Sequence, residues 1–271
     1  MKTISILGCG WLGKALADAL LKKGYAVNGS VRSEKKRDAL KAIGITPYVL
    51  QVENTEILGD FKSFLSAADI IITAFPPGIR RNPNANYAAR IKQVLASLPS
   101  HSNCKCLHLS SIGVFGATQG EVNESTKPEP DRNVGTQLLE AEKAVIAFDT
   151  NATIVRLGGL VGNARHPVKQ LAGKTGLASA MAPTNLVHQI DVIAFLLAVI
   201  DKNLWGQTFH CVSPLHQLRG EFYTQECIEN GLPLPQFLSG KSNRSKKVLD
   251  TKSAEVFGFK YQLARCRFKD C

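Results

Sequence analysis

The chain has 271 residues, of which 44% are hydrophobic, and a formal net charge of +11 at pH 7. This length supports a sizeable core, and no apolar run approaches the roughly 18 residues of a membrane span. The basic residues are scattered, and the densest runs, Arg32–Arg37 and Lys241–Lys247, hold no aromatic residue. We therefore expect a cytoplasmic protein with a small-molecule substrate, and consider nucleic acid an unfavoured partner.

The cysteines also limit the class of protein. There are seven, an odd number, and no two have C-x-x-C spacing. This pattern argues against a disulfide framework and against a zinc site, which usually takes closely spaced ligand pairs. We expect no metal ion, and the sequence leaves a homodimer open.

Apolar strand patterns alternate with amphipathic helix patterns along most of the chain. The expected strands are Thr3–Cys9, Tyr25–Arg32, Thr46–Val52, Asp69–Phe75, Lys105–Ser111, Ala152–Gly162 and Gln207–Ser213. The expected helices are Trp11–Gly24, Ser33–Gly44, Asn86–Leu98, Thr136–Phe148 and Asp191–Ile200, with helical patches near 219–230 and 253–257. Ser33 and Asp191 are the expected N-caps of their helices. This alternation predicts βαβ crossovers, and therefore an α/β fold with a Rossmann-type, doubly wound parallel sheet.

A glycine-rich turn joins the first expected strand to the first expected helix. Gly8, Gly10 and Gly13 have G-x-G-x-x-G spacing, with Trp11 and Leu12 between the last two. In this context Gly8 permits a tight turn, Gly10 lets the backbone approach a pyrophosphate, and Gly13 lets the helix pack closely on the strand. The turn predicts a dinucleotide site, with the diphosphate at the helix N-terminus.

The end of the second expected strand bears on the choice of dinucleotide. NAD sites usually hold an acidic residue there, whereas this chain has Arg32 followed by Ser33. An arginine can pair with a 2′-phosphate, so the sequence favours NADP over NAD. The alternative is that Arg32 only covers the surface beside the adenine.

The turn after the fourth expected strand adds further contacts. We expect Ala74 and Pro76 to carry the chain past the adenine ribose. Arg80 and Arg81 lie in the same loop and are candidates for contact with an anionic substrate, although water is the commoner partner of a loop arginine.

Together these elements divide the chain into two parts. Residues 1–162 are expected to form an NAD(P)-binding domain. Residues 163–271 are expected to supply the remaining sheet elements and a small C-terminal substrate lobe.

Four motifs together resemble a known superfamily. GCGWLG, LSSIGVFG (Leu109–Gly116), VRLGGLVG (Val155–Gly162) and NLVHQIDV (Asn185–Val192) have the order and spacing of extended short-chain dehydrogenases/reductases, in the NAD-dependent epimerase/dehydratase branch. The resemblance covers essentially the whole chain. The segment Gly162–Gly176 and the last motif also look like the small bacterial YeeZ-type proteins, an atypical group of this superfamily.

The resemblance implies roles for particular residues, and one departure from the pattern. Ser111 occupies the position of the residue that polarises the substrate oxygen, and Ser110 before it is assigned to the cofactor. The family's Tyr and Lys, which form its acid–base pair, correspond here to Val134 and Leu138. The chain has no tyrosine between Tyr87 and Tyr223, so a shifted alignment does not restore the pair. Neither a valine nor a leucine side chain can donate or accept a proton.

Three other residues are candidates for catalysis or substrate binding. His188 could exchange a proton near neutral pH, the alternative being a structural histidine bonded to backbone. Arg165 and His166 follow Gly162 in a loop expected at the carboxyl edge of the sheet, where ligands bind in such folds, and are candidates for contact with the substrate. The alternative is that both belong to the plain surface.

Two functions therefore stay open. One is an atypical NAD(P)-dependent oxidoreductase or epimerase/dehydratase, acting on a small and anionic or sugar-like substrate. The other is a non-catalytic protein that senses NADP(H) and regulates a partner.

Overall fold

The structure is a computed structural model that describes residues 1–79, 82–98, 104–240 and 244–271. Arg80, Arg81 and the first three residues of the basic run at 241–247 lie outside the described residues. Within the described ranges, no helix is both long and apolar enough to cross a membrane.

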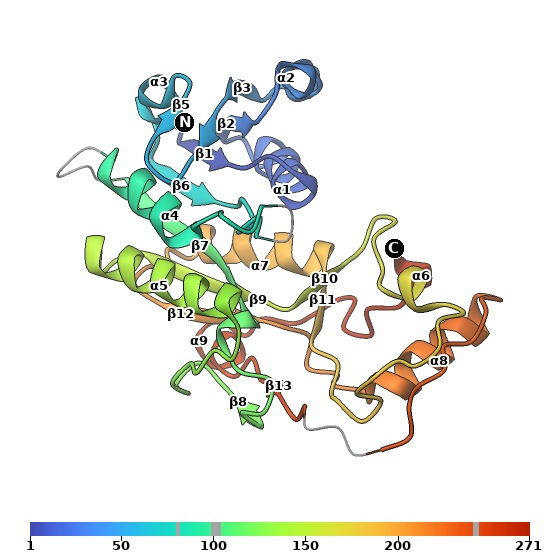
Figure 1. The fold of residues 1–271 in the computed structure, drawn as a ribbon. Coiled ribbons are helices and arrows are strands. Elements are labelled where there is room, and N and C mark those ends of the chain that lie inside the picture. The colour runs from blue at the N-terminus through green and yellow to red at the C-terminus, as the bar shows by residue number, and fades with distance from the viewer. Residues whose placement is uncertain (80–81, 99–103, 241–243) are drawn as a thin grey trace. The chain divides into compact units, whose positions relative to one another are not determined.

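Seven strands of the described residues form one central sheet (Figure 1). They are β1 (Thr3–Leu7), β2 (Ala26–Val31), β3 (Thr46–Val49), β6 (Ile70–Thr73), β7 (Lys105–Ser111), β9 (Thr153–Leu157) and β12 (Thr208–Cys211). Their order across the sheet is β3-β2-β1-β6-β7-β9-β12, and the pairings from β3 to β7 are parallel. This reversal of strand order beside β1 is that of the doubly wound dinucleotide-binding fold, which confirms the predicted fold class.

The helices follow the apolar periodicity of the sequence. They are α1 (Trp11–Lys22), α2 (Glu34–Lys41), α3 (Phe61–Leu65), α4 (Tyr87–Ala96), α5 (Asn133–Phe148), α6 (Val168–Leu171), α7 (Gln189–Asp201), α8 (Arg219–Glu229) and α9 (Lys252–Phe257), with 3-10 turns η1 (Ile112–Val114) and η2 (Phe268–Asp270). In α1, which contacts β1 and β2, Leu12, Leu16 and Leu20 recur every four residues and are buried. The helix ends before Gly24, whose φ of +85° suits a residue without a side chain.

Two expected strands are interrupted. The third stops at Val49, and Leu50 separates it from β4 (Gln51–Val52), which pairs with β5 (Ile57–Leu58) in a ribbon of its own. The sixth stops at Leu157. The Gly158 N–H bonds Cys211 O at 3.0 Å, whereas the Gly159 N–H bonds Asn185 O at 2.7 Å. The backbone therefore changes partners between these two glycines.

The segment after this interruption forms a second small sheet. It is β10 (Gly159–Val161), which pairs in parallel with β11 (Leu186–His188). A further pair, β8 (Glu121–Val122) with β13 (Lys247–Val248), joins two segments far apart in the chain. The apolar pattern of 152–162 could not distinguish one strand from two.

Helix starts differ from expectation in two places. α7 begins at Gln189, so Asp191 lies within its first turn and is not the N-cap. The Asp191 carboxylate instead accepts the N–H groups of Gln262 at 2.7 Å and Leu263 at 3.0 Å. α5 begins at Asn133 rather than at Thr136. Ser33 is the N-cap of α2 as predicted, although its side chain makes no capping bond.

The chain divides into two compact units. Unit 1 comprises Met1–Ser110, Thr136–Val155 and Leu197–Thr208, and unit 2 comprises Ser111–Gly135, Arg156–Leu196 and Phe209–Cys271. The division expected at Gly162 concerns cofactor and substrate roles, and it stays a prediction.

A buried histidine lies in the core of unit 1. His108 in β7 is 0% exposed, and its Nδ1 lies 2.6 Å from Thr73 Oγ1. Its Nε2 has no hydrogen-bond partner among the described residues, and the Tyr87 ring is 6.2 Å away between centroids. Burial disfavours the charged imidazolium, and lowers the pKa of His108 to about 4.

This burial predicts acid destabilisation. The unfolded chain takes up a proton at its ordinary pKa near 6.5, whereas folded His108 resists it until about 4. The contribution is therefore complete above pH 6.5 and is lost as the pH falls toward 4, at a cost on the order of 3 kcal/mol. Urea unfolding at several pH values should show a shallower acid dependence for His108→Gln than for the unmodified chain. His210, whose pKa burial also lowers to about 4, leaves a residual slope in the variant. Equal slopes in both proteins would contradict the assignment.

Candidate cofactor site and active site

The glycine turn in unit 1 is held by the packing of its own backbone. Gly8 has a φ of +113°, and a Cβ there would lie 2.9 Å from the backbone N of Phe75. A Cβ on Gly13 would lie 2.3 Å from Gly8 O. Real Cβ atoms do not approach backbone so closely, so both positions need glycine for the fold itself.

Gly10 differs from its two neighbours. It is exposed, and a Cβ placed there would meet no heavy atom within 4 Å. It is the N-cap of α1 and offers no side chain to the first-turn N–H groups, which include those of Trp11 and Leu12. Open space therefore faces a helix N-terminus that attracts anions. The residues present fit a dinucleotide pyrophosphate.

A serine on the neighbouring strand fixes this turn. Ser30 in β2 accepts the Gly8 N–H on its Oγ at 2.8 Å, and the Cys9 N–H on its carbonyl at 2.7 Å. The sequence analysis did not identify Ser30. The parallel pairing of β1 with β2 brings Ser30 beside Gly8, and this contact depends on the strand pairing rather than on a local sequence pattern.

Arg32 and Ser33 lie just past the end of β2, as predicted. Both are exposed, and Arg32 makes no hydrogen bond or ion pair with another described residue. The neighbouring Arg37, by contrast, pairs with Glu34 at 2.6 Å. An arginine and a hydroxyl without partners, just ahead of α2, are suited to a phosphate.

The end of β6 lies against the glycine turn. The Ala74 N–H bonds Leu7 O at 2.9 Å, and the backbone of Ala74 and Phe75 is what a Cβ on Gly8 would strike. Pro76, two residues on, is exposed. The structure thus brings Ala74 to the same edge of the sheet as Gly8, where the sequence placed the ribose contacts.

Ser110 ends the part of β7 that belongs to unit 1. Its Oγ donates to Glu142 Oε1 at 2.5 Å, and the two residues are 5% and 1% exposed. The hydroxyl proton of Ser110 is therefore committed to a buried carboxylate on α5. Sequence reasoning missed Glu142, because it lies 32 residues away in an ordinary helical pattern.

Ser111, in unit 2, has the opposite arrangement. Its Oγ accepts the Gly113 N–H at 3.1 Å, as the N-cap of η1. Among the described residues nothing accepts its hydroxyl proton, and the side chain is half-buried. Ser111 can therefore donate a hydrogen bond to a ligand oxygen.

The start of α5 carries the two residues at the family's acid–base positions. Val134 is 36% exposed, and Leu138 is 5% exposed. Gly135 between them allows close packing, since a Cβ there would lie 2.4 Å from Gly113 O. The helix start thus lies against the serine loop, with an apolar side chain where the family has its tyrosine.

Lys246 forms hydrogen bonds to the backbone of the serine loop. Its Nζ donates to Ile112 O at 3.0 Å and to Phe115 O at 2.7 Å. Burial is the main cause that lowers its pKa, while Asp131 opposes the shift and Arg132 adds to it. Sequence analysis had no signal for this residue, because the contacts span more than 130 positions.

The two candidate histidines of unit 2 share one pattern of contacts. His188 Nδ1 accepts the Ile190 N–H at 3.2 Å, and its Nε2 lies 3.1 Å from Asp270 O. His166 Nδ1 accepts the Val168 N–H at 3.2 Å, and its Nε2 lies 3.0 Å from Cys266 O. Both rings are buried, and backbone occupies both nitrogens of each. For His188 these are the contacts of the structural alternative, whereas His166, for which plain surface was the alternative, is 3% exposed. The catalytic and substrate-binding roles stay predictions.

Two further predictions concern Arg165 and metal ions. Arg165 is exposed, and its backbone closes a bridge with Gly162, N to O at 2.9 and 3.0 Å. Among the residues that the structure describes, no three His, Cys, Asp or Glu side chains gather as a metal ion would require.

Comparison with known proteins bears on this geometry. The model of a family described as NAD(P)H-binding matches residues 8–203. Protein YeeZ of Escherichia coli (strain K12) is 32% identical over 267 residues, which cover 97% of this chain and 96% of that protein.

Two solved structures share the fold. UDP-glucuronic acid 4-epimerase from Bacillus cereus, in complex with NAD, is 18% identical with a TM-score of 0.80, covering 98% of this chain and 93% of its own. dTDP-glucose 4,6-dehydratase from Bacillus anthracis, also with NAD, is 13% identical with a TM-score of 0.80, covering 100% and 94%.

The same substitution, glycine to alanine, should affect NADPH binding at Gly10 and protein stability at Gly13. Gly10→Ala adds a methyl group in open space, so thermal unfolding should be unchanged, while NADPH affinity falls at least about 10-fold. Gly13→Ala forces a Cβ against Gly8 O, and should lower the free energy of unfolding by about 2 kcal/mol. Calorimetry and NADPH fluorescence titration measure the two effects. Unchanged NADPH binding by a folded Gly10→Ala protein would exclude this turn as the pyrophosphate site.

Proposed function

Because the chain belongs to the NAD(P)H-binding family, we propose that it is an atypical NADP-dependent oxidoreductase or epimerase/dehydratase of the extended short-chain dehydrogenase/reductase type. Its substrate in this proposal is small and anionic or sugar-like. The observation that carries the proposal is the open space at Gly10, between two glycines that the fold itself requires. The nicotinamide would supply the hydride chemistry, and the protein supplies position and electrostatics.

The cofactor preference follows from Arg32. The guanidinium has no partner among the described residues, and the end of β2 has no carboxylate to accept a ribose 2′-hydroxyl. A 2′-phosphate would receive the charge-assisted hydrogen bonds of Arg32 and the hydroxyl of Ser33. This supports NADP over NAD.

Ser111 is the residue proposed to hold the reacting oxygen. Its lone pair is engaged by the Gly113 N–H, which orients the Oγ, while its proton is not donated to any described residue. A hydroxyl held in this way can stabilise negative charge that develops on a substrate carbonyl oxygen. Ser110 cannot serve in the same way, because its proton goes to Glu142.

The cation beneath the serine loop supports an anionic substrate. Lys246 places a positive charge against the carbonyls of Ile112 and Phe115, one and four residues after Ser111. Arg132 and Arg244 both act on Lys246 electrostatically, against one carboxylate, Asp131. Lys246 thus supplies a positive charge next to the serine loop.

The alternative is a protein that binds NADP(H) without turnover. Val134 and Leu138 cannot relay a proton, and both nitrogens of His188 are bonded to backbone. An enzyme must then take its proton from water or from a loop acid. A sensor needs no proton relay, and the same cofactor site would serve it.

The remaining parts of the proposal concern partners and location. The partner proposed is a small molecule rather than nucleic acid, and the location is the cytoplasm. A homodimer is compatible with both functions.

Replacement of Arg32 should weaken the binding of NADPH much more than the binding of NADH. In Arg32→Ala the Kd of NADPH should rise roughly 10- to 100-fold, because charge-assisted hydrogen bonds to the 2′-phosphate are lost. The Kd of NADH should change little. Lys41→Ala, which removes one positive charge from the last turn of α2, the helix that Arg32 precedes, serves as the control. An equal loss for NADH and NADPH would refute the 2′-phosphate contact.

Turnover distinguishes the enzyme from the sensor. NADPH absorbance should fall with one member of a panel of aldehydes, ketones and sugar nucleotides. Ser111→Ala should then lower kcat about 100-fold, with the affinity for NADPH kept. Ser111→Thr, which retains a hydroxyl, should restore part of the rate. Tight NADPH binding with no turnover across the panel would favour the sensor.

A further inference from the structure

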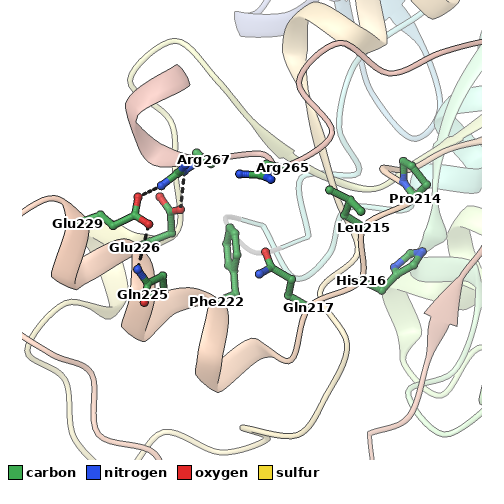
Figure 2. A pocket seen from close by; sticks show the side chains of 10 residues that line it. All are labelled: Pro214, Leu215, His216, Gln217, Phe222, Gln225, Glu226, Glu229, Arg265 and Arg267. Carbon is green, nitrogen blue, oxygen red and sulfur yellow. Dashed lines mark hydrogen bonds and ion pairs between the residues drawn. The ribbon is translucent and has the colours of Figure 1, made fainter.

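Unit 2 contains a pocket that the proposed function does not use. Its volume is about 580 Å³, within the range of small-molecule sites. Three segments line it: the Pro214–Gln217 turn that follows β12, one face of α8, and the C-terminal stretch from Arg265 to Arg267 (Figure 2). The α8 residues recur at i, i+3, i+4 and i+7, which is one helix face.

The C-terminal wall is tied to α8 by charge. Arg267 Nε lies 3.7 Å from Glu226 Oε1, and its guanidinium also pairs with Glu229. Glu226 Oε2 accepts the Phe268 N–H at 2.7 Å, and Glu229 Oε1 accepts Gln225 Nε2 at 3.0 Å. Both carboxylates at the pocket are therefore satisfied by neighbouring groups.

The Pro214–Gln217 turn is equally fixed. Ser213 Oγ donates to Ala264 O and accepts the Leu215 N–H, the latter at 3.2 Å. Gln217 O accepts the Thr184 N–H at 2.8 Å. Ion pairs and hydrogen bonds thus hold two walls in place, so little ordering would be needed when a ligand binds.

Arg265 is the one charged group of the lining without a partner among the described residues. Figure 2 shows its guanidinium beside the pocket, apart from the Arg267 pairs and facing the side of Phe222 and Gln217. Glu226 and Glu229 both pair with Arg267 and accept hydrogen bonds from neighbouring groups, so neither carboxylate is paired with Arg265. The lining has two arginines and two glutamates, and Arg265 is the guanidinium that is available to pair with a carboxylate of a ligand.

The remaining lining defines the rest of the ligand. Phe222, which is 4% exposed, contributes the edge of an aromatic side chain to the lining, and Leu215, which is 46% exposed, contributes an apolar side chain. The exposed Gln217 adds an amide that can donate or accept a hydrogen bond. Apolar walls with a few polar groups are typical of sites for small organic molecules.

We propose that this pocket is a second ligand site, and that it binds a small organic carboxylate with a flat, apolar body. The guanidinium of Arg265 receives the carboxylate in a bidentate contact, and the body lies against Phe222 and Leu215. None of these residues belongs to the cofactor site or to the serine loop, so the site does not use the residues on which the proposed function rests.

The test uses benzoate as the probe, and benzamide as its uncharged counterpart of the same shape. Two-dimensional amide NMR of the full chain should show benzoate shifting the signals of Leu215, Gln217 and Phe222, with a Kd in the millimolar range expected of a fragment. Benzamide should bind at least about 10-fold more weakly, because it lacks the charge-assisted contact.

Two variants with equal loss of charge complete the experiment. Arg265→Gln should abolish the benzoate shifts, whereas Lys260→Gln, at an exposed lysine outside the lining, should leave them unchanged. An unchanged far-ultraviolet circular dichroism spectrum shows that both variants are folded. Equal binding of benzoate and benzamide, or full binding by Arg265→Gln, would overturn the proposal. Inorganic phosphate that displaces benzoate at equal concentration would also overturn it, because the apolar body would then contribute nothing.

Discussion

The close approach of backbone to backbone at the glycine turn is the constraint on which the cofactor site depends. Gly8 adopts a φ of +113° against Phe75, and Gly13 leaves no room for a Cβ beside Gly8 O. These contacts bring the first turn of α1 to the carboxyl end of β1. Once that helix start is fixed, Gly10 has open space in front of it. The anion-binding geometry is thus a consequence of packing that the fold needs in any case.

Several polar side chains of unit 2 already have hydrogen-bond partners within the protein. His166 and His188 each engage both ring nitrogens with backbone, so neither holds a free proton acceptor. Lys246 is committed to two carbonyls of the serine loop. Ser111 is the exception, with its lone pair engaged and its proton free of described partners. Chemistry in this part of the molecule is therefore expected of the serine rather than of the histidines.

The pattern of the sequence predicted most elements, because strand and helix periodicities are local properties. It was wrong where one apolar run served two purposes. The run at 152–162 divides at Gly158, where the backbone exchanges one partner segment for another. It was also wrong at Asp191, whose carboxylate suits an N-cap but is used instead by the N–H groups of Gln262 and Leu263. In both cases hydrogen bonds to a segment distant in the chain replaced the contacts that the local pattern predicted.

The sequence by itself determined the parallel sheet, the glycine turn and the arginine at the end of β2, because each could be predicted from a local pattern of residues. Only the tertiary structure decided that Ser110 gives its proton to Glu142 and that both nitrogens of His188 are occupied. Only the tertiary structure also paired both glutamates of the pocket with Arg267 and left Arg265 without an ion pair among the described residues. The physical reason is that hydrogen bonds and ion pairs are exclusive. A side chain's chemistry depends on which distant partner reaches it, and no local pattern records that outcome.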